Sequence, residues 1–159
     1  MMIELPSNKK NSKSHAKVNK TSGRFGVRKE KLNHQVIIEL GSNIEPEKYI
    51  PKAKQLLSEK FKIISESKFV KTKPIGGISQ PDFINGAVLL ETELSAQELK
   101  TVLKSLEEQL GRKKGSPSFG PRTMDLDIVV WNDEIVDSDF YKRAYLKESV
   151  LELCPDLRY

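Results

Sequence analysis

The 159-residue chain contains one cysteine and two histidines, and both scarcities limit the chemistry that it can perform. A single cysteine, Cys154, excludes an internal disulfide and any cysteine-rich metal cluster, and it fits a reducing, cytoplasmic setting. His15 and His34 both precede the segment in which globular patterning begins. The folded part therefore offers no candidate for Ser-His-Asp, Cys-His or histidine–metal chemistry.

Long apolar runs are also absent, so we expect no membrane span, which would need about 18 apolar residues or more. Acidic residues are scarce near the N-terminus. Residues 1–35 hold nine Lys or Arg and two Glu, which leaves 18 basic and 20 acidic residues for the rest of the chain. The net charge of +5 therefore arises in residues 1–35. Because this segment has too few apolar residues to offset the entropy of ordering, we predict that it is a disordered tail.

Three roles remain open for the basic tail. A solvated extension without a specific role is the usual behaviour of such a charge run, and a basic arm that contacts nucleic acid or another polyanion is the second. The third is a targeting presequence. The tail is rich in Lys rather than Arg and has no apolar core, so it matches neither a transit peptide nor a secretory signal closely.

Residues 36–159 have the patterning of a single folded domain. Strand and helix signals alternate along it. We expect strands at 36–40, 61–70 and 83–94 and over the segment that carries Asp125 and Asp127, and helices at 45–60, 95–110 and 141–153. The order β-α-β-β-α-β predicts the α+β class: a ferredoxin-like βαββαβ sandwich, with helices on one face of an antiparallel sheet, the other face free for a site, and a C-terminal helical extension.

Asp125 and Asp127 lie one residue apart in a segment that otherwise has the composition of a buried strand. Because side chains alternate along a strand, both acids point to one face, with Cα atoms roughly 6 to 7 Å apart. Like charges this close repel, so the pair indicates either a bound metal or basic neighbours. Carboxylate oxygens suit Mg²⁺, and two metals about 4 Å apart could share such a pair. An isolated pair of this kind is more often a solvent-facing strand edge.

A basic loop with two Gly and two Pro precedes the acidic pair, between Arg112 and Arg122. Cations on a loop beside metal-holding carboxylates are what a polyphosphate site requires, although the loop alone could be an ordinary solvated surface. Phe83 and Asn85 lie two residues apart after the Gly- and Pro-containing segment 71–82. On one strand face they could stack on a flat heterocycle and hydrogen-bond its edge, while Phe83 as a core residue is the commoner outcome.

Five motifs in the same order resemble the 6-hydroxymethyl-7,8-dihydropterin pyrophosphokinase family. They are Gly41-Ser42-Asn43, Thr72-x-Pro74, Gln80-Pro81-Asp82-Phe83-x-Asn85-x-Ala87-Val88, Glu107-x-x-x-Gly111-Arg112 and Gly120-Pro121-Arg122-Thr123-x-Asp125-Leu126-Asp127-Ile128. The resemblance spans residues 36–157. It implies transfer of a pyrophosphoryl group from ATP to the pterin hydroxymethyl oxygen, with release of AMP, in folate biosynthesis.

The resemblance also implies roles for individual residues. Two Mg²⁺ would be held by Asp125 and Asp127, and Arg112 and Arg122 would clamp the triphosphate, so these four form the catalytic set. The remaining ATP-binding positions would be Glu107, Lys114, Ile128 and Arg143, and the pterin-binding positions Thr72, Lys73, Ile75, Phe83, Asn85, Phe119 and Tyr145. We expect a monomer whose partners are ATP and hydroxymethyl-dihydropterin, with nucleic acid contacted only through the tail.

The chain departs from the family pattern in two places. Many members have a Pro-His segment after the strand of the acidic pair, where this chain has Val136-Asp137-Ser138-Asp139-Phe140. Ser118 and Phe119 stand where a basic residue and Trp are frequent. Beside an active pyrophosphokinase, two hypotheses therefore stay open: a degenerate homologue that binds pterin without efficient turnover, and a ferredoxin-like nucleic-acid binder, although the latter's aromatic pattern is absent.

Overall fold

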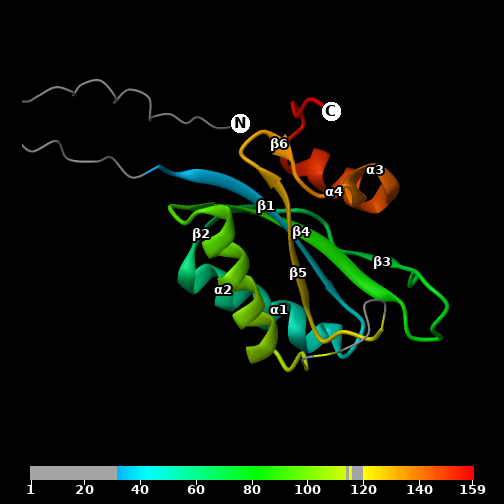
Figure 1. Cartoon of the computed structure of the whole chain (residues 1–159). Coiled ribbons are helices and arrows are strands. Elements are labelled where there is room, and N and C mark those ends of the chain that lie inside the picture. The colour runs from blue at the N-terminus through cyan, green and yellow to red at the C-terminus, as the bar shows by residue number, and fades with distance from the viewer. Residues whose placement is uncertain (1–31, 114, 116–119) are drawn as a thin grey trace, which may run out of the picture.

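The computed structural model of the protein describes residues 32–113, 115 and 120–159, so most of the basic tail lies outside the described residues (Figure 1). The helices and strands follow one another as β1 (His34–Ser42), α1 (Pro46–Lys60), β2 (Lys62–Glu66), β3 (Val70–Thr72), β4 (Phe83–Thr92), α2 (Ala96–Gln109), β5 (Asp125–Trp131), β6 (Glu134–Ile135), α3 (Asp139–Lys142) and α4 (Ala144–Leu153).

The strands form one antiparallel sheet in the order β2-β4-β1-β5-β6, with β3 also paired to β4. Two α-helical crossovers place β4 between β2 and β1, and β5 on the other side of β1, which is the split βαβ arrangement of a ferredoxin-like sandwich. The predicted α+β class and ferredoxin-like fold are therefore confirmed. Within the described residues, no helix is both long and apolar enough to cross a bilayer.

Helices α1 and α2 cover one face of the sheet (Figure 1). Their apolar stripes meet Ile38 and Leu40 of β1, Leu126 of β5 and Met124, which immediately precedes β5. Helix α2 begins at the predicted capping box, in which the Ser95 side chain accepts a hydrogen bond from the Glu98 backbone N–H while the Glu98 side chain accepts one from the Ser95 N–H. This packing fixes β5 so that alternate side chains must face the opposite side.

The opposite face is only partly free, which corrects our expectation that it would be open. Helices α3 and α4 pack over one half of it, where Phe140, Leu146 and Val150 lie against Ile37 and other apolar residues of β1, β4 and β5. A register shift between Ile37 and Ile38 in the β1–β5 pairing turns both Val129 and Val130 toward these helices. The uncovered half of this face, toward Asp125, is where the site described below lies.

The segment 61–70 was predicted as one strand, and the structure divides it into β2 and β3. Between them, the Ser67 N–H donates to the carbonyl of Ala87, and the Ser67 hydroxyl accepts from the Ala87 N–H. Phe69 then lays its ring over Gly86, where a Cβ atom would come within 2.5 Å of the ring. This detour interrupts the pairing but still delivers β3 to the end of β4 that bears Asn85.

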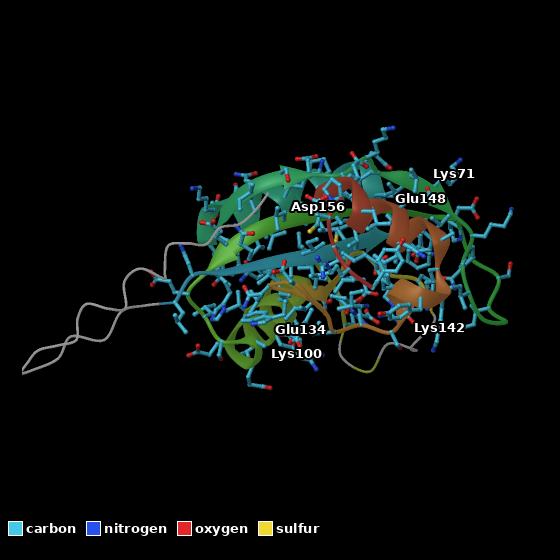
Figure 2. All side chains as sticks on the ribbon, turned by 90° about the horizontal axis from the view of Figure 1, so that it is seen from above. Lys71, Lys100, Glu134, Lys142, Glu148 and Asp156 are labelled. Atoms are coloured by element: carbon cyan, nitrogen blue, oxygen red, sulfur yellow. The ribbon has the colours of Figure 1, made fainter. Side chains whose placement is uncertain are left out.

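The last helix, predicted over 141–153, is likewise divided. Arg143 has an extended backbone (φ −125°, ψ 110°) and separates α3 from α4. Strand β1 begins at His34, two residues before the predicted start, so His34 belongs to the sheet. The centroid of its ring lies 4.6 Å from the ring centroid of Trp131. Charged side chains such as Lys71 and Glu148 are exposed at the periphery (Figure 2).

Candidate active site

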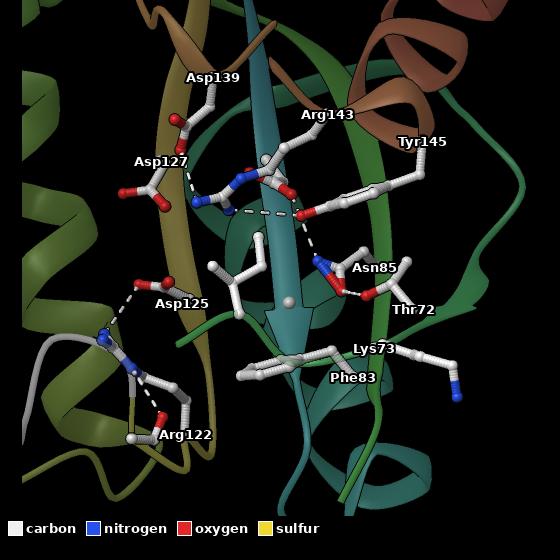
Figure 3. A pocket seen from close by; sticks show the side chains of 14 residues that line it. Thr72, Lys73, Phe83, Asn85, Arg122, Asp125, Asp127, Asp139, Arg143 and Tyr145 are labelled. Carbon is white, nitrogen blue, oxygen red and sulfur yellow. Dashed lines mark hydrogen bonds and ion pairs between the residues drawn. The ribbon is translucent and has the colours of Figure 1, made fainter. Parts of the chain in front are cut away.

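A cavity of about 200 Å³ opens on the uncovered half of the sheet, and we call it the small cavity. The aromatic rings of Phe83 and Tyr145 lie on opposite sides of it, with Thr72 and Asn85 on one flank and the acidic residues of β5 on the other (Figure 3). Its floor includes Gly41, where a Cβ atom would come within 3.0 Å of the Asn85 amide nitrogen. An aromatic enclosure with an amide at one edge suits a flat heterocycle.

A second, larger cavity of about 860 Å³ lies on the other side of β5, and we call it the groove. One wall is formed by α2, which contributes the exposed Lys100 and Lys104 and the buried Glu107 at helical spacing. The opposite wall is formed by Ile128, Trp131 and the segment 136–138. Cationic side chains along the wall of a groove are suited to a phosphorylated ligand.

The two cavities meet at Arg122, Asp125 and Asp127, which line both of them. Met124, Leu126 and Ile128 belong to the core on the helical side, so the predicted alternation of side chains is confirmed. A ligand in the small cavity and a ligand in the groove would therefore approach each other at the acidic pair.

Asp125 has cationic partners. The Arg112 guanidinium lies 2.7 Å from its Oδ1 atom, and the Arg122 guanidinium lies 3.6 Å from the same atom. Arg122 is 7% exposed and also donates to the Gly120 carbonyl at 3.3 Å. The sequence left open either a bound metal or basic neighbours for the acidic pair. Asp125 has basic neighbours, since it contacts the guanidinium groups of Arg112 and Arg122.

Asp127 has a different environment. Although solvent reaches it through the cavities, desolvation by their walls and the negative charges of Asp125, Glu107 and Asp137 raise the pKa of Asp127 to about 7. This excess of negative charge is what a divalent cation would offset.

The acidic pair fits Mg²⁺, which needs few protein ligands. Among the described residues, no group of three or more His, Cys, Asp or Glu is arranged to hold a metal ion. Mg²⁺ is commonly bound through one or two carboxylates and completes its octahedron with water and substrate phosphates. Asp125 and Asp127, at the junction of the two cavities, supply such a pair of carboxylates.

Glu107 anchors the base of the groove. It is 7% exposed, and its Oε2 atom accepts a hydrogen bond from the Leu126 N–H at 2.7 Å, while its Oε1 atom lies 3.1 Å from Arg112. Burial raises the pKa of Glu107, and the bond from Leu126 and the charge of Arg112 act in the opposite direction. These contacts tie the end of α2 to the start of β5.

Asn43 joins three segments around the site. Its amide nitrogen donates to the Gln80 side chain at 2.8 Å and to the Pro81 carbonyl at 2.9 Å, and its amide oxygen accepts from the Arg122 N–H at 2.8 Å. The Asn43 N–H in turn donates to the Arg122 carbonyl at 3.0 Å. The Gly41-Ser42-Asn43 motif therefore holds the loop before β4 against the chain that carries Arg122.

The predicted site residues fall into the two cavities with few exceptions. The small cavity is lined by Thr72, Lys73, Ile75, Phe83, Asn85 and Tyr145, and the groove by Glu107, Arg112 and Ile128. Arg143, predicted to contact the nucleotide, lines the small cavity instead, where it pairs with Asp139 at 3.3 Å and contacts Tyr145 at 3.5 Å. Lys114 and Phe119 lie outside the described residues.

Sequence reasoning assigned no role to Glu39, Lys100 or Lys104, and it named Asp139 only as part of the segment 136–140, although all four line these cavities. Glu39 is the most informative because an acid inside the run Val36–Leu40 was a visible signal, on the strand face opposite Ile38 and Leu40. Burial and the charges of Asp127 and Asp125 raise the pKa of Glu39 to about 8. The two lysines could have been found from their spacing with Glu107 on one helical face.

Residues 37–155 match the model of the 7,8-dihydro-6-hydroxymethylpterin-pyrophosphokinase family. The 2-amino-4-hydroxy-6-hydroxymethyldihydropteridine pyrophosphokinase of Haemophilus influenzae is 32% identical over 131 residues, which cover 76% of this chain and 81% of the relative. The proteins of the same name from Pseudomonas aeruginosa and Bacillus subtilis are 31% and 32% identical, over 78% and 77% of this chain and 83% and 80% of their own lengths.

Proposed function

This chain belongs to the 7,8-dihydro-6-hydroxymethylpterin-pyrophosphokinase family, and we propose how its residues carry out the family's reaction. The enzyme transfers pyrophosphate from ATP to 6-hydroxymethyl-7,8-dihydropterin in folate biosynthesis. The hydroxymethyl oxygen forms a bond to the β-phosphorus, the bond from that phosphorus to the bridging oxygen of the α-phosphate breaks, AMP leaves, and the hydroxyl proton is lost. The chain must bring two substrates together in line.

The observation that carries our assignment of residues is the meeting of the two cavities at Asp125 and Asp127. The pterin would occupy the small cavity between Phe83 and Tyr145, with Asn85 at its edge. ATP would lie in the groove, with its phosphates toward Arg112 and Arg122. The reacting atoms would then lie together at the acidic pair, and such positioning lowers the barrier to phosphoryl transfer more than a strong base would.

Asp125 and Asp127 would hold Mg²⁺, and we propose two ions, which would neutralise phosphate oxygens when bound. Arg112 already contacts Asp125, so its guanidinium is placed where it could turn toward a phosphate. Arg122 is buried and tied to Gly120, which fixes its position at the junction. Arg143 and Asp139 would close the end of the small cavity beside Tyr145.

Lys100 and Lys104 would add positive charge on the α2 wall of the groove, facing Val136 and Asp137. This places cations for the nucleotide on a helix rather than on the segment after β5, which carries Asp137 and Asp139 in this chain. Lys114 and Phe119 remain predicted ligands of ATP and pterin from the sequence alone.

We further propose that the protein acts as a monomer, because residues of one chain line both cavities, and that it is cytoplasmic, because a single cysteine fits a reducing compartment. The basic tail would be the only segment to contact nucleic acid. Deletion of residues 1–31 should leave catalysis intact and remove any retention on heparin. A loss of activity on this deletion would instead place the tail in the catalytic machinery.

The assignment of residues is tested by following AMP release with ATP, hydroxymethyl-dihydropterin and Mg²⁺. Asp125→Asn and Asp127→Asn should each lower kcat by on the order of 100-fold or more, since each removes a metal-binding charge at the reacting centre. Asp133→Asn, in the exposed turn before β6, is the matched control and should keep wild-type turnover. Unchanged AMP release in both site variants would overturn the assignment, and pterin binding without any turnover in the wild type would indicate the degenerate homologue.

A further inference from the structure

Glu39 lies at the centre of the sheet, inside the proposed pterin site. In the register of β1 it pairs with Ala87 of β4 on one side and with Asp127 of β5 on the other. Its side chain is 7% exposed and lines the small cavity. A buried carboxyl group in a ligand cavity is costly unless its hydrogen bonds are used, so its partner is informative.

The partner of Glu39 is the amide of Asn85. The Asn85 Nδ2 atom donates to Glu39 Oε2 at 3.3 Å, and the Thr72 hydroxyl donates to Asn85 Oδ1 at 3.1 Å. A hydroxyl can donate or accept, so Thr72 would satisfy either orientation of the amide. In this contact the Oε2 atom of Glu39 is the acceptor, and a carboxylate offers acceptor oxygens only, which selects the orientation in which the NH₂ group faces β1.

We propose that Glu39 is a positioning residue, which fixes the amide of Asn85 and thereby the order of donor and acceptor that the small cavity presents to the pterin edge. The inference rests on the proposed function, because it takes Asn85 to contact the pterin. A primary amide has two N–H donors and two acceptor sites. Glu39 and Thr72 use one of each, so one donor and one acceptor remain for the ligand.

The remaining donor and acceptor complement a ring edge that carries a carbonyl oxygen next to an N–H, as the 4-oxo and N3–H groups of a pterin do. A 4-amino pteridine presents the reverse order, an N–H next to a bare ring nitrogen. With the amide held by Glu39, this analogue would place donor against donor and acceptor against acceptor. A site with fixed polar groups rejects such a mismatch strongly.

The test compares the binding of 6-hydroxymethylpterin with that of 2,4-diamino-6-hydroxymethylpteridine to the full chain, by calorimetry. The wild type should prefer the 4-oxo compound by about 100-fold. Glu39→Gln should reduce this preference at least about tenfold, because a glutamine amide can turn to offer either its oxygen or its nitrogen to Asn85. The 4-amino compound should bind more tightly to the variant than to the wild type, which damage to the fold would not produce.

Two further variants keep the inference falsifiable. Glu39→Met retains the length without the carboxyl acceptor and should also reduce the preference, and Glu66→Gln, which removes a carboxylate outside both cavities, should leave it unchanged. An unchanged preference in both Glu39 variants, or equal weakening of both compounds, would overturn the role of Glu39 while leaving the proposed function in place. Failure of the wild type to bind either compound would instead overturn the proposed function, and this inference with it.

Discussion

The Arg112 guanidinium connects two acidic residues, with its Nη1 atom 2.7 Å from Asp125 Oδ1 and 3.1 Å from Glu107 Oε1. Asp125 begins β5 and Glu107 lies near the end of α2, so one side chain links the junction of the two cavities to the base of the groove. Arg112 is only partly exposed, which strengthens its charge-assisted hydrogen bonds relative to those on an open surface.

Arg112→Ala should therefore weaken nucleotide binding while sparing the pterin. We expect the KM for ATP to rise by about 10- to 100-fold, because a lost hydrogen bond to a charged group costs roughly 1.5 to 3 kcal/mol. Arg112→Lys should recover only part of the effect, since an ammonium group cannot bridge two acceptors as a guanidinium fork does. Arg158 is an exposed arginine near the C-terminus, and Arg158→Ala is the control. An equal rise in the KM for ATP of this variant would contradict the prediction.

The lysines of α2 should matter in the same assay. Replacing both Lys100 and Lys104 with Gln removes two positive charges from the groove but keeps helix propensity nearly constant. We expect the KM for ATP to rise about 3- to 10-fold and the effect to shrink at high salt, because both side chains are exposed and screened. Steady-state kinetics at two ionic strengths measures this, and a salt-independent loss of kcat would argue against a role in nucleotide binding.

Asn43→Ala should destabilise the protein through the segments that it connects. Three hydrogen bonds of its buried amide would be lost, to Gln80, Pro81 and Arg122, so the free energy of unfolding should fall by about 2 to 4 kcal/mol. Urea unfolding measures the loss, with Asn33→Ala as the exposed control. Both substrates should also bind more weakly, since the loop before β4 borders the small cavity and Arg122 lines both cavities.

The sequence was sufficient to predict the order of the main elements, because this order depends on local patterns, whereas the site residues were implied by the resemblance, and most of them line one of the two cavities. The alternation around Asp125 and the capping box at Ser95 are set by neighbours in the chain, and both are confirmed. The division of the segment 61–70 was not predictable, since it depends on contacts of Ser67 and Phe69 with β4, which is distant in the sequence. The break at Arg143 escaped prediction too, as apolar residues continue at helical spacing across it.

That division of the strand is itself testable at Gly86. A Cβ atom there would come within 2.5 Å of the Phe69 ring, so Gly86→Ala should displace Phe69 and the junction of β2 and β3. Overpacking of this kind costs about 1 to 3 kcal/mol, measured as a lower urea midpoint. Gly77→Ala is the matched control, because a Cβ atom there meets nothing within 4 Å. Equal stability of the two variants would show that Phe69 moves aside freely.

The last prediction concerns the acidity of Glu39, which no pattern in the sequence could supply. Its pKa depends on burial and on Asp127 and Asp125, brought beside it by the pairing of β1 with β5. In the unfolded chain a glutamate ionises near its ordinary pKa of about 4.3. In the folded protein Glu39 keeps its proton until about pH 8. Between these values the native state therefore binds more protons than the unfolded state.

Because stability falls with rising pH wherever the native state binds more protons, the free energy of unfolding should decrease between about pH 5 and pH 8. Glu39 alone can contribute on the order of 1 kcal/mol per pH unit, and Asp127, whose pKa is about 7, acts in the same direction over a narrower range. Glu39→Gln, which cannot ionise, should flatten this dependence and make the protein more stable than the wild type at pH 8. Urea unfolding of both proteins from pH 5 to 9 without Mg²⁺ measures the two slopes. Parallel slopes would mean that Glu39 ionises near its ordinary pKa despite its burial.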